Sequence, residues 1–376
     1  MQGFGAYEQF KGRTCYRPPS PPFPRLDDIW ETLDPANRAI DAFARALAAF
    51  PVPGVVGKLF ARLDAVHSSG AEGSTTTFTD LLEYQTALRR ARDIDDARDV
   101  FATAVAFDDL AESGAKSASG TVLDIHHRLF IKAVDPILRE GAGKWKGLPN
   151  GTHDDEAPSG IFYYCSPDTV KAAMTEWEAL TLAVDSRPEL VRQALSHWMF
   201  EHIHPVPDGN GRIGRLMVPI MMRQKGVVEH ACAFLGEAVH INKNIYIEAL
   251  KRGRLLGDLT GWTRVFCAMA KQTAEANLSR LEKLGSLHAR WLAVTSGVRS
   301  HSAVHPLVPW VLTKPKFTVR DALVALGGKV SFQAMNTAIL RLKDFGIVEQ
   351  DNVAGRERLF SAAEVIKLFE PVTTPQ

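Results

Sequence analysis

Helical periodicity is the feature of this chain that most limits the folds open to it. From Leu26 onward, apolar residues recur at i, i+3, i+4 and i+7, the spacing that places them on one face of a helix. The pattern resumes near Pro167 and continues to about Arg290. We therefore predict a main domain that is mainly α-helical, in which strands are rare.

Prolines mark the first predicted boundaries. Five of them fall within residues 14–25, which predicts an extended strap or linker with few backbone donors. A helix is expected to begin at Leu26, and a second helix to cover about 37–50 until Pro51 and Pro53 end it. The N-terminal part should thus be a strap followed by short helices.

Turn-forming residues set the next expected boundaries. A third helix is predicted over about 55–66, where apolar residues share one stripe, and the polar, glycine-containing stretch His67–Gly73 should stop it. Thr79 is then the expected N-cap of the following helix.

Residues 141–160 interrupt the helical pattern with five glycines and two prolines. The next residues, Ile161–Tyr164, give the best short strand signal in the chain. A glycine-rich loop before such a strand predicts a β-hairpin or flap. We interpret the acidic cluster Asp154–Glu156 within it as a solvated loop.

Composition excludes several classes of protein. The chain has 376 residues, 45% of them apolar, so two or three domains with sizeable cores are expected. A formal net charge of +1 provides no global attraction to DNA or to an anionic membrane. No apolar stretch is long enough for a transmembrane helix, and the first residues lack the apolar segment of a secretory signal. The four cysteines form no CxxC pair, which favours reduced thiols and a cytoplasmic location.

The sequence changes in character after about Gly297. Two short helices are predicted over 317–326 and 331–345, followed by two strands around 347–350 and 358–360. A helix, a turn, a helix and a two-stranded wing resemble a winged helix-turn-helix.

The basic side chains of this C-terminal module are few and alternate with acidic ones. They are Lys329, Arg341, Lys343, Arg356 and Arg358. Such a set is a poor footprint for nucleic-acid phosphates. A protein-contact or dimerisation role, including a homodimer, is therefore favoured over DNA binding, and both are left open.

Residues 204–208 combine a constrained imidazole with a carboxylate. Pro205 and Pro207 cannot continue a helix, so they hold His204 on a rigid loop. Asp208 is a hard oxygen ligand of the kind that Mg²⁺ prefers. The pair fits a general base next to a metal-dependent site.

A glycine-rich turn and two arginines follow directly. Gly209, Asn210 and Gly211 allow a tight turn whose N–H groups point to one place, and apolar helical sequence begins immediately afterwards. Arg212 and Arg215 are three residues apart and therefore lie on one face of the first helical turn. Together these residues predict a site for nucleotide phosphates.

The run H-P-x-x-D-G-N-G-R-x-x-R, from His204 to Arg215, resembles the signature of the Fic family. Members of that family mostly transfer AMP from Mg·ATP to a Ser, Thr or Tyr hydroxyl of a target protein. One departure is Val206, where the family usually has Phe. Because that position is expected to pack inward, Val should alter core volume rather than chemistry.

Ser68–Gly73 resembles the inhibitory motif of the same family, (S/T)-x-x-x-E-(G/N), with Glu72 as its glutamate. Its place before the catalytic motif, the proline-rich strap and the C-terminal module resemble the subclass with an N-terminal inhibitory helix and a C-terminal winged helix. The resemblance implies a helical core with a hairpin flap and three parts: 1–75, 76–296 and 297–376.

The resemblance also implies roles for individual residues. His204 resembles the general base, Asp208 the Mg²⁺ ligand, and Asn210 with Gly211 the anion hole for the α-phosphate. Arg212 resembles the β-phosphate contact, and Arg215 the γ-phosphate contact. The implied nucleotide-binding set is Gly209, Asn210, Gly211, Arg212, Ile213, Gly214, Arg215, Asn242 and Tyr246.

The implied activity is that of an autoinhibited protein adenylyltransferase with ATP as substrate and Mg²⁺ as cofactor. The target protein would be held by strand addition at the flap, Gly141–Tyr164. Two alternatives stay open: removal of AMP from a modified protein by the same residues, and a DNA-binding regulator with a vestigial catalytic domain. The latter is disfavoured because every chemically demanding position from His204 to Arg215 is present.

Overall fold

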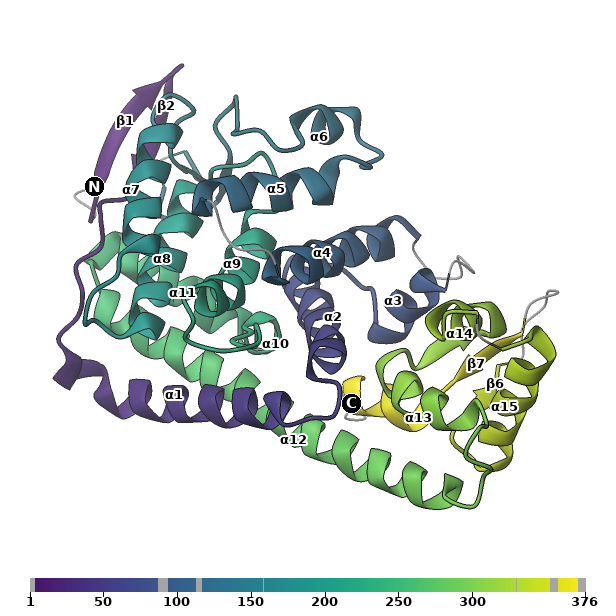
Figure 1. The fold of residues 1–376 in the computed structure, drawn as a ribbon. Helices are drawn as coiled ribbons and strands as arrows, with labels where there is room; N and C mark the ends of the chain where they lie inside the picture. The colour runs from purple at the N-terminus through teal and green to yellow at the C-terminus, as the bar shows by residue number, and fades with distance from the viewer. Residues whose placement is uncertain are drawn as a thin grey trace.

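The computed structural model shows that helices dominate the chain, as predicted. It describes residues 4–86, 94–112, 117–157, 159–328, 330–351 and 358–370. Figure 1 shows a helical body with a small sheet at one end and a second small sheet in the C-terminal module. No helix in these ranges is long and apolar enough to cross a lipid bilayer.

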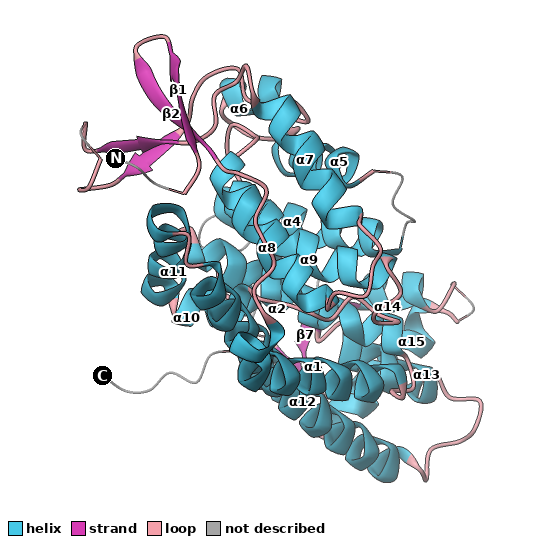
Figure 2. Ribbon diagram, turned by 90° about the vertical axis from the view of Figure 1, so that its left-hand side faces the viewer, coloured by secondary structure: helices cyan, strands magenta, loops and turns pink. Residues whose placement is uncertain are grey.

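Two adjacent helices occupy the centre of the body. They are α8 (Glu189–Ile203) and α9 (Asn210–Gln224), whose residues are largely buried. The long helix α12 (Leu259–Thr295) passes beside α8, and α1 (Leu26–Ala48) packs along α12 (Figure 2). The loop between α8 and α9 carries the predicted site, so this central pair fixes its position.

The helix α1 is one continuous element rather than the two helices predicted over this region. Pro35 lies inside it. Proline removes one backbone hydrogen bond, but Leu33, Ala36 and Ile40 stay buried on the stripe that faces the core. Burial of that stripe offsets the lost hydrogen bond, so the prediction of a break was wrong.

The helix α2 (Pro53–Ala71) runs five residues beyond the predicted stop at Val66. His67, Ser68 and Ser69 would favour a turn in isolation, but all three are buried against the protein. Tertiary contacts therefore override the local preference, and the predicted inhibitory motif begins inside a helix.

The next helix, α3 (Phe78–Gln85), is capped by Thr77 rather than by the predicted Thr79. Thr77 and Asp80 form a reciprocal capping box. Thr79 instead donates from its backbone N–H and its hydroxyl to a carboxylate oxygen of Glu370, at 2.9 Å and 2.6 Å. Both threonines precede acidic and apolar residues, so the local sequence does not distinguish between these two N-cap positions.

The predicted strand and hairpin are present. Strand β4 (Ile161–Tyr163) pairs antiparallel with β3 (Gly151–His153), which is the exposed edge of a four-stranded sheet. The other two strands, β1 (Ala6–Phe10) and β2 (Arg13–Arg17), form an N-terminal hairpin that the sequence analysis did not predict. An extended segment over residues 18–25 then leads to α1.

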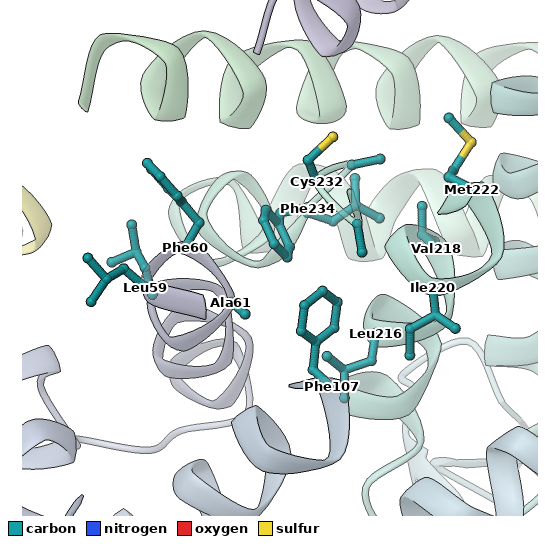
Figure 3. Packing of buried hydrophobic residues seen from close by; sticks show 14 of the residues in the cluster. Leu59, Phe60, Ala61, Phe107, Leu216, Val218, Ile220, Met222, Cys232 and Phe234 are labelled. Carbon is teal, nitrogen blue, oxygen red and sulfur yellow. The ribbon is translucent and has the colours of Figure 1, made fainter. Parts of the chain in front are cut away.

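The remaining helices of the body surround one large apolar cluster, and a second, smaller cluster lies between α2, α3 and α4 (Ile94–Glu112). Besides α4, these helices are α5 (Ala118–Phe130), α6 (Pro136–Gly141), α7 (Val170–Leu182), α10 (Gly236–Ile241) and α11 (Lys243–Leu256). Figure 3 shows Phe107 of α4 against Leu216 of α9 and Phe234, with Phe60 of α2 nearby. This packing ties α2 to the centre of the protein.

The C-terminal module combines four helices with a three-stranded sheet. Its elements are α13 (Val304–Thr313), β5 (Lys316–Thr318), α14 (Val319–Ala325), α15 (Phe332–Asp344), β6 (Glu349–Gln350), β7 (Leu359–Ser361) and α16 (Ala363–Phe369). The predicted first helix starts later than expected, because Phe317 pairs with Phe360 in the sheet.

The two predicted helices and two predicted strands are present, and α13, β5 and α16 are additional; a winged helix-turn-helix stays a prediction for this module. The predicted wing turn, with Arg356, and also Lys329 lie outside the described residues. Phe369 of α16 packs on Phe60 of α2 and Phe78 of α3, with ring centroids 5.3 Å and 5.2 Å apart. The module is therefore joined to α2 through an aromatic cluster.

Candidate active site

A cavity of about 490 Å³ opens where α2, α9 and α11 meet the β3–β4 hairpin. Its volume lies within the range of small-molecule binding sites. Its lining includes Glu72, Glu201, His204, Gly211, Arg215 and Tyr246. The cavity thus brings together residues from five separate parts of the sequence.

His204 ends α8 and is held in one tautomer. Its Nδ1 lies 3.1 Å from the carbonyl oxygen of Glu201. Since a carbonyl can only accept, Nδ1 carries the proton and Nε2 keeps its lone pair. The ring is stacked on Tyr164, with centroids 4.0 Å apart and planes 8° from parallel.

The protonation of His204 suits a proton acceptor. Burial, reinforced by the positive charge of Lys146, lowers the pKa of His204 to about 3. The ring is therefore neutral throughout the physiological pH range. A neutral imidazole with an unprotonated Nε2 at a cavity can take a proton from a hydroxyl.

The turn before α9 is shaped by Gly209 and Asn210. Gly209 has a φ of +76°, and a Cβ there would lie 2.9 Å from the Phe130 ring, so glycine is required. The Asn210 side chain accepts from Val206 N–H at 3.0 Å and donates to Val206 O at 2.8 Å. The Asn210 side chain thus shapes the loop. Only the backbone N–H of Asn210 points out of the helix end, as N–H groups of a first helical turn do.

The first turn of α9 leaves backbone donors without intrahelical partners, as every helix start does. Gly211 of this turn lines the cavity. A Cβ on Gly211 would overlap a carboxylate oxygen of Glu72. The Glu72 carboxylate therefore lies at the helix N-terminus, the place where a phosphate oxygen is most favourably bound.

Arg215 is buried and fully engaged by α2. Its Nε donates to Ser68 Oγ at 2.8 Å, and its Nη2 donates to Ser68 O at 2.9 Å and to Glu72 Oε1 at 2.6 Å. Glu72 thus contacts Arg215 through a single guanidinium nitrogen. Although burial opposes ionisation, the Arg215 charge and hydrogen bond hold the pKa of Glu72 below its usual value.

Asp208 and Arg212 lie beside the cavity rather than in its lining. Asp208 is exposed, and its Oδ1 accepts from the Gly209 N–H at 2.7 Å. Arg212 Nη2 is 3.9 Å from Asp208 Oδ2, and the guanidinium lies over the Phe130 ring. No cluster of three or more His, Cys, Asp or Glu ligands occurs within the described ranges.

The other predicted nucleotide-binding residues separate into two groups. Tyr246 lines the cavity, is buried, and has its hydroxyl 2.8 Å from His197 Nε2. Asn242 is outside the lining and donates to Ala238 O at 2.9 Å and Gln272 Oε1 at 3.1 Å.

Two residues of the motif pack inside the protein. Ile213 is buried in the core, and a Cβ on Gly214 would meet a carboxylate oxygen of Glu201 at 2.5 Å. Both therefore position α9, and neither appears in the cavity lining.

Sequence reasoning missed several residues of the site. Glu201 is buried in the cavity wall, and burial raises its pKa to about 8 despite the charge of Arg215. Because Glu201 lies three residues before His204, its closeness to the motif in the sequence could have identified it as a site residue. Asp154, interpreted as solvated, is buried and contacts Arg254 at 2.6 Å and Lys251 at 3.0 Å. No sequence pattern pointed to Asp154, because its partners lie about a hundred residues away on α11.

Family models match two consecutive stretches of the chain. The model described as Fic/DOC family N-terminal matches residues 30–109, and the model described as Fic/DOC family matches residues 118–222. The second stretch contains every motif residue from His204 to Arg215.

Similar proteins include one curated relative and two solved structures. A protein adenylyltransferase Fic of Drosophila willistoni is 27% identical over 212 residues, or 54% of this chain and 41% of that protein. The chain therefore matches about two fifths of the length of this relative. A Fic family protein of Desulfovibrio desulfuricans G20 has 16% identity and a TM-score of 0.59, covering 95% of this chain and 99% of that chain.

A Fic domain containing signaling protein of Bacteroides thetaiotaomicron has 18% identity and a TM-score of 0.51. The match covers 66% of this chain and 96% of that chain. At such identities the two solved structures support the fold alone.

Proposed function

We propose that this chain, which belongs to the Fic/DOC family, is an autoinhibited protein adenylyltransferase. It would transfer AMP from Mg·ATP to a Ser, Thr or Tyr hydroxyl of a target protein, and also to itself. The observation that carries the proposal is the cavity in which a neutral His204 faces the same space as Gly211 and Arg215.

His204 is the general base of the proposed reaction. Its Nε2 accepts the proton of the target hydroxyl as that oxygen attacks the α-phosphorus and pyrophosphate leaves. The stack on Tyr164 and the bond from Nδ1 to Glu201 O keep the ring oriented for this step. The base therefore needs no rearrangement to accept the proton.

The first turn of α9 and two arginines are the proposed phosphate site. Backbone N–H groups at Asn210 and Gly211 face the α-phosphate, where charge must be stabilised during transfer. Arg212 and Arg215 are assigned to the β- and γ-phosphates. Tyr246, in the cavity wall, and Asn242 are assigned to the adenine side.

Asp208 fits a magnesium ion that arrives with the nucleotide. Its carboxylate is exposed and keeps oxygen lone pairs directed to solvent. Mg²⁺ in nucleotide sites commonly uses one or two carboxylates together with phosphates and waters. Bound there, the ion would neutralise phosphate charge, and Asp208 would hold it.

The exposed edge strand β3 is the proposed place for the target. Its edge is unpaired in the sheet order β1-β2-β4-β3, and Thr152 and His153 line the cavity. Asp154 fixes the base of the hairpin through its buried ion pair with Arg254. A target segment added as a further strand would bring its hydroxyl towards His204.

Glu72 is the proposed inhibitory residue. Its carboxylate engages Arg215 and lies against Gly211, so it occupies the space and the charge partner that we assign to the γ-phosphate. ATP bound beside it would have a misplaced triphosphate, unsuited to in-line attack. The proposal also includes membership of the subclass with an N-terminal inhibitory helix. It further includes the division into residues 1–75, 76–296 and 297–376, and a cytoplasmic location.

The proposal is tested with ATP labelled on either the α- or the γ-phosphate. Purified parent and Glu72→Gly proteins are incubated with each nucleotide, Mg²⁺ and a cell lysate. The expected result is protein-bound label from α-labelled ATP alone, stronger with Glu72→Gly and absent with Glu72→Gly/His204→Ala. Label from the γ-phosphate would indicate phosphorylation, and release of label from a pre-modified protein would indicate AMP removal. Either result, or no label at all, would contradict the proposal.

A further inference from the structure

A short segment before β3 runs along the catalytic loop, residues 203–206. All four backbone carbonyls of that loop accept hydrogen bonds from Lys146 or Asn150. Lys146 donates from Nζ to Ile203 O at 3.0 Å and from its backbone N–H to Pro205 O at 2.9 Å. Asn150 Nδ2 donates to the other two carbonyls, at 3.3 Å and 2.9 Å. Lys146 Nζ also donates to Asn150 Oδ1 at 2.7 Å, so the two residues form one clamp.

The catalytic loop has few other donors for these carbonyls: within the described residues only Val206 O has one, Asn210 Nδ2 at 2.8 Å. The loop follows the last turn of α8, whose carbonyls lack intrahelical donors, and Pro205 and Pro207 have no N–H groups. His204 also has a φ of +51°, a left-handed conformation that only one other non-glycine residue adopts in the described ranges. Such a conformation persists only where its surroundings enforce it, and the clamp supplies that enforcement.

The charge of Lys146 is unusual for a residue with this structural task. Its side chain is only 3% exposed, and no carboxylate in the described part of the chain lies within ion-pairing distance of Nζ. Burial lowers the pKa of Lys146 to about 7, against the charges of Cys165, Cys15 and Glu8. A neutral donor would satisfy the same carbonyls without the cost of burying an unpaired ammonium. Satisfying the loop carbonyls therefore does not explain why this position holds a lysine.

The charge of Lys146 acts on the protonation of His204. After burial, Lys146 makes the largest contribution that lowers the pKa of His204. His202 acts in the same direction, whereas Glu72 and the backbone carbonyl of Glu201 act in the opposite one. The Lys146 charge thus offsets the carboxylate that approaches His204 from α2.

We propose that Lys146 and Asn150 are positioning residues for the reaction assigned above. The clamp fixes the His204 ring against Tyr164, and the Lys146 ammonium adds to burial in favouring the neutral, proton-accepting form of that ring. The inference rests on the proposed function, because it concerns the base of that reaction. It assigns to residues 146–150, which lie within the predicted flap, a task separate from holding the target.

The test compares Lys146→Met, Lys146→Arg and the unmodified lysine, in protein that keeps Glu72 for the pKa of His204 and in Glu72→Gly protein for AMP transfer. The pKa of His204 is measured from the NMR titration of its imidazole C–H, assigned with a His204→Gln variant. Lys146→Met should raise that pKa, although burial still holds it below 6.5, and kcat should fall about tenfold because the Ile203 carbonyl loses its donor. Lys146→Arg should keep the low pKa, and the KM for ATP should be unchanged in both variants.

Asn150→Ala separates positioning from charge. It leaves the Lys146 ammonium in place but removes the donors to two loop carbonyls, so transfer should fall by ~10–10²-fold without a change in the pKa of His204. An unchanged pKa of His204 in folded Lys146→Met would overturn the electrostatic half. If Asn150→Ala transfers AMP at the rate of the protein that keeps Asn150, the claim that the clamp positions His204 is wrong. This result decides the point even if Lys146→Met fails to fold. If the pKa shifts as expected but Glu72→Gly transfers no AMP, the proposed function fails and the clamp stands.

Discussion

Two segments that are distant in the sequence act on the active loop, and they do so by different means. Lys146 and Asn150 bind the backbone carbonyls of residues 203–206 and so fix where the loop lies. Ser68 and Glu72 of α2 bind a side chain, Arg215, and so limit what the loop can bind. Removing the first set of contacts should lower transfer, and removing the second should raise it.

The two segments also differ in exposure. The Lys146 side chain is buried, whereas the Glu72 side chain is 48% exposed at the end of a helix. A half-exposed carboxylate loses less than a buried one when it leaves its partner, because water can solvate it. Under the proposed function, buried contacts hold the loop on one side and a half-exposed contact blocks the nucleotide site on the other.

The largest expected effect is the loss of the proposed base, His204. His204→Ala, in the Glu72→Gly protein, should lower AMP transfer by ~10²–10⁴-fold, because general-base catalysis contributes about that much. Initial rates at saturating Mg·ATP measure it, and the thermal midpoint shows whether the fold is kept. Transfer within a few-fold of the control would remove His204 from this role, and the clamp would then have nothing to position.

A large effect on stability is expected where α2 meets the C-terminal module. Phe369→Ala should lower the free energy of unfolding by about 3–5 kcal/mol, because Phe369 is buried against Phe60 and Phe78. Denaturant unfolding measures the change. Phe345→Ala is the matched control: that ring is 39% exposed in the same module, so its effect should be small. Equal effects for the two variants would mean that the module does not support α2.

The smallest expected effect tests the α2 side alone. Ser68→Ala in the parent removes the acceptor of Arg215 Nε, which weakens the inhibited arrangement by roughly 1 kcal/mol and should raise transfer about fivefold. Ser69→Ala is the control, because the buried Ser69 hydroxyl has no hydrogen-bond partner among the described residues. If both variants leave the rate unchanged, Ser68 does not help to hold Arg215 away from the nucleotide.

Sequence alone predicted the parts of this molecule that depend on local signals. The helical class and the β3–β4 hairpin were both expected, and both are present. Amphipathic periodicity, a glycine-rich break and a dense motif are each contained within a few dozen residues.

Features set by distant partners could not be predicted. The end of α2 depends on burial of His67–Ser69, and the role of Lys146 depends on a loop about 57 residues further along the chain. The N-terminal hairpin had a local signal, the turn at Lys11 and Gly12, but its place in the sheet depends on pairing of β2 with β4, far away in the sequence. Local propensity carries no information about such partners.

The rate ratio between Glu72 variants and the parent tests the central claim most directly. Initial AMP transfer is measured at saturating Mg·ATP for the parent, Glu72→Gln and Glu72→Gly. Freeing Arg215 and the helix N-terminus should raise transfer by Glu72→Gly about 10²-fold, because a misplaced triphosphate costs roughly that much. Glu72→Gln, which keeps the shape but loses the charge, should be intermediate. Equal rates for all three proteins would mean that the contact between Glu72 and Arg215 blocks nothing, and would contradict the account.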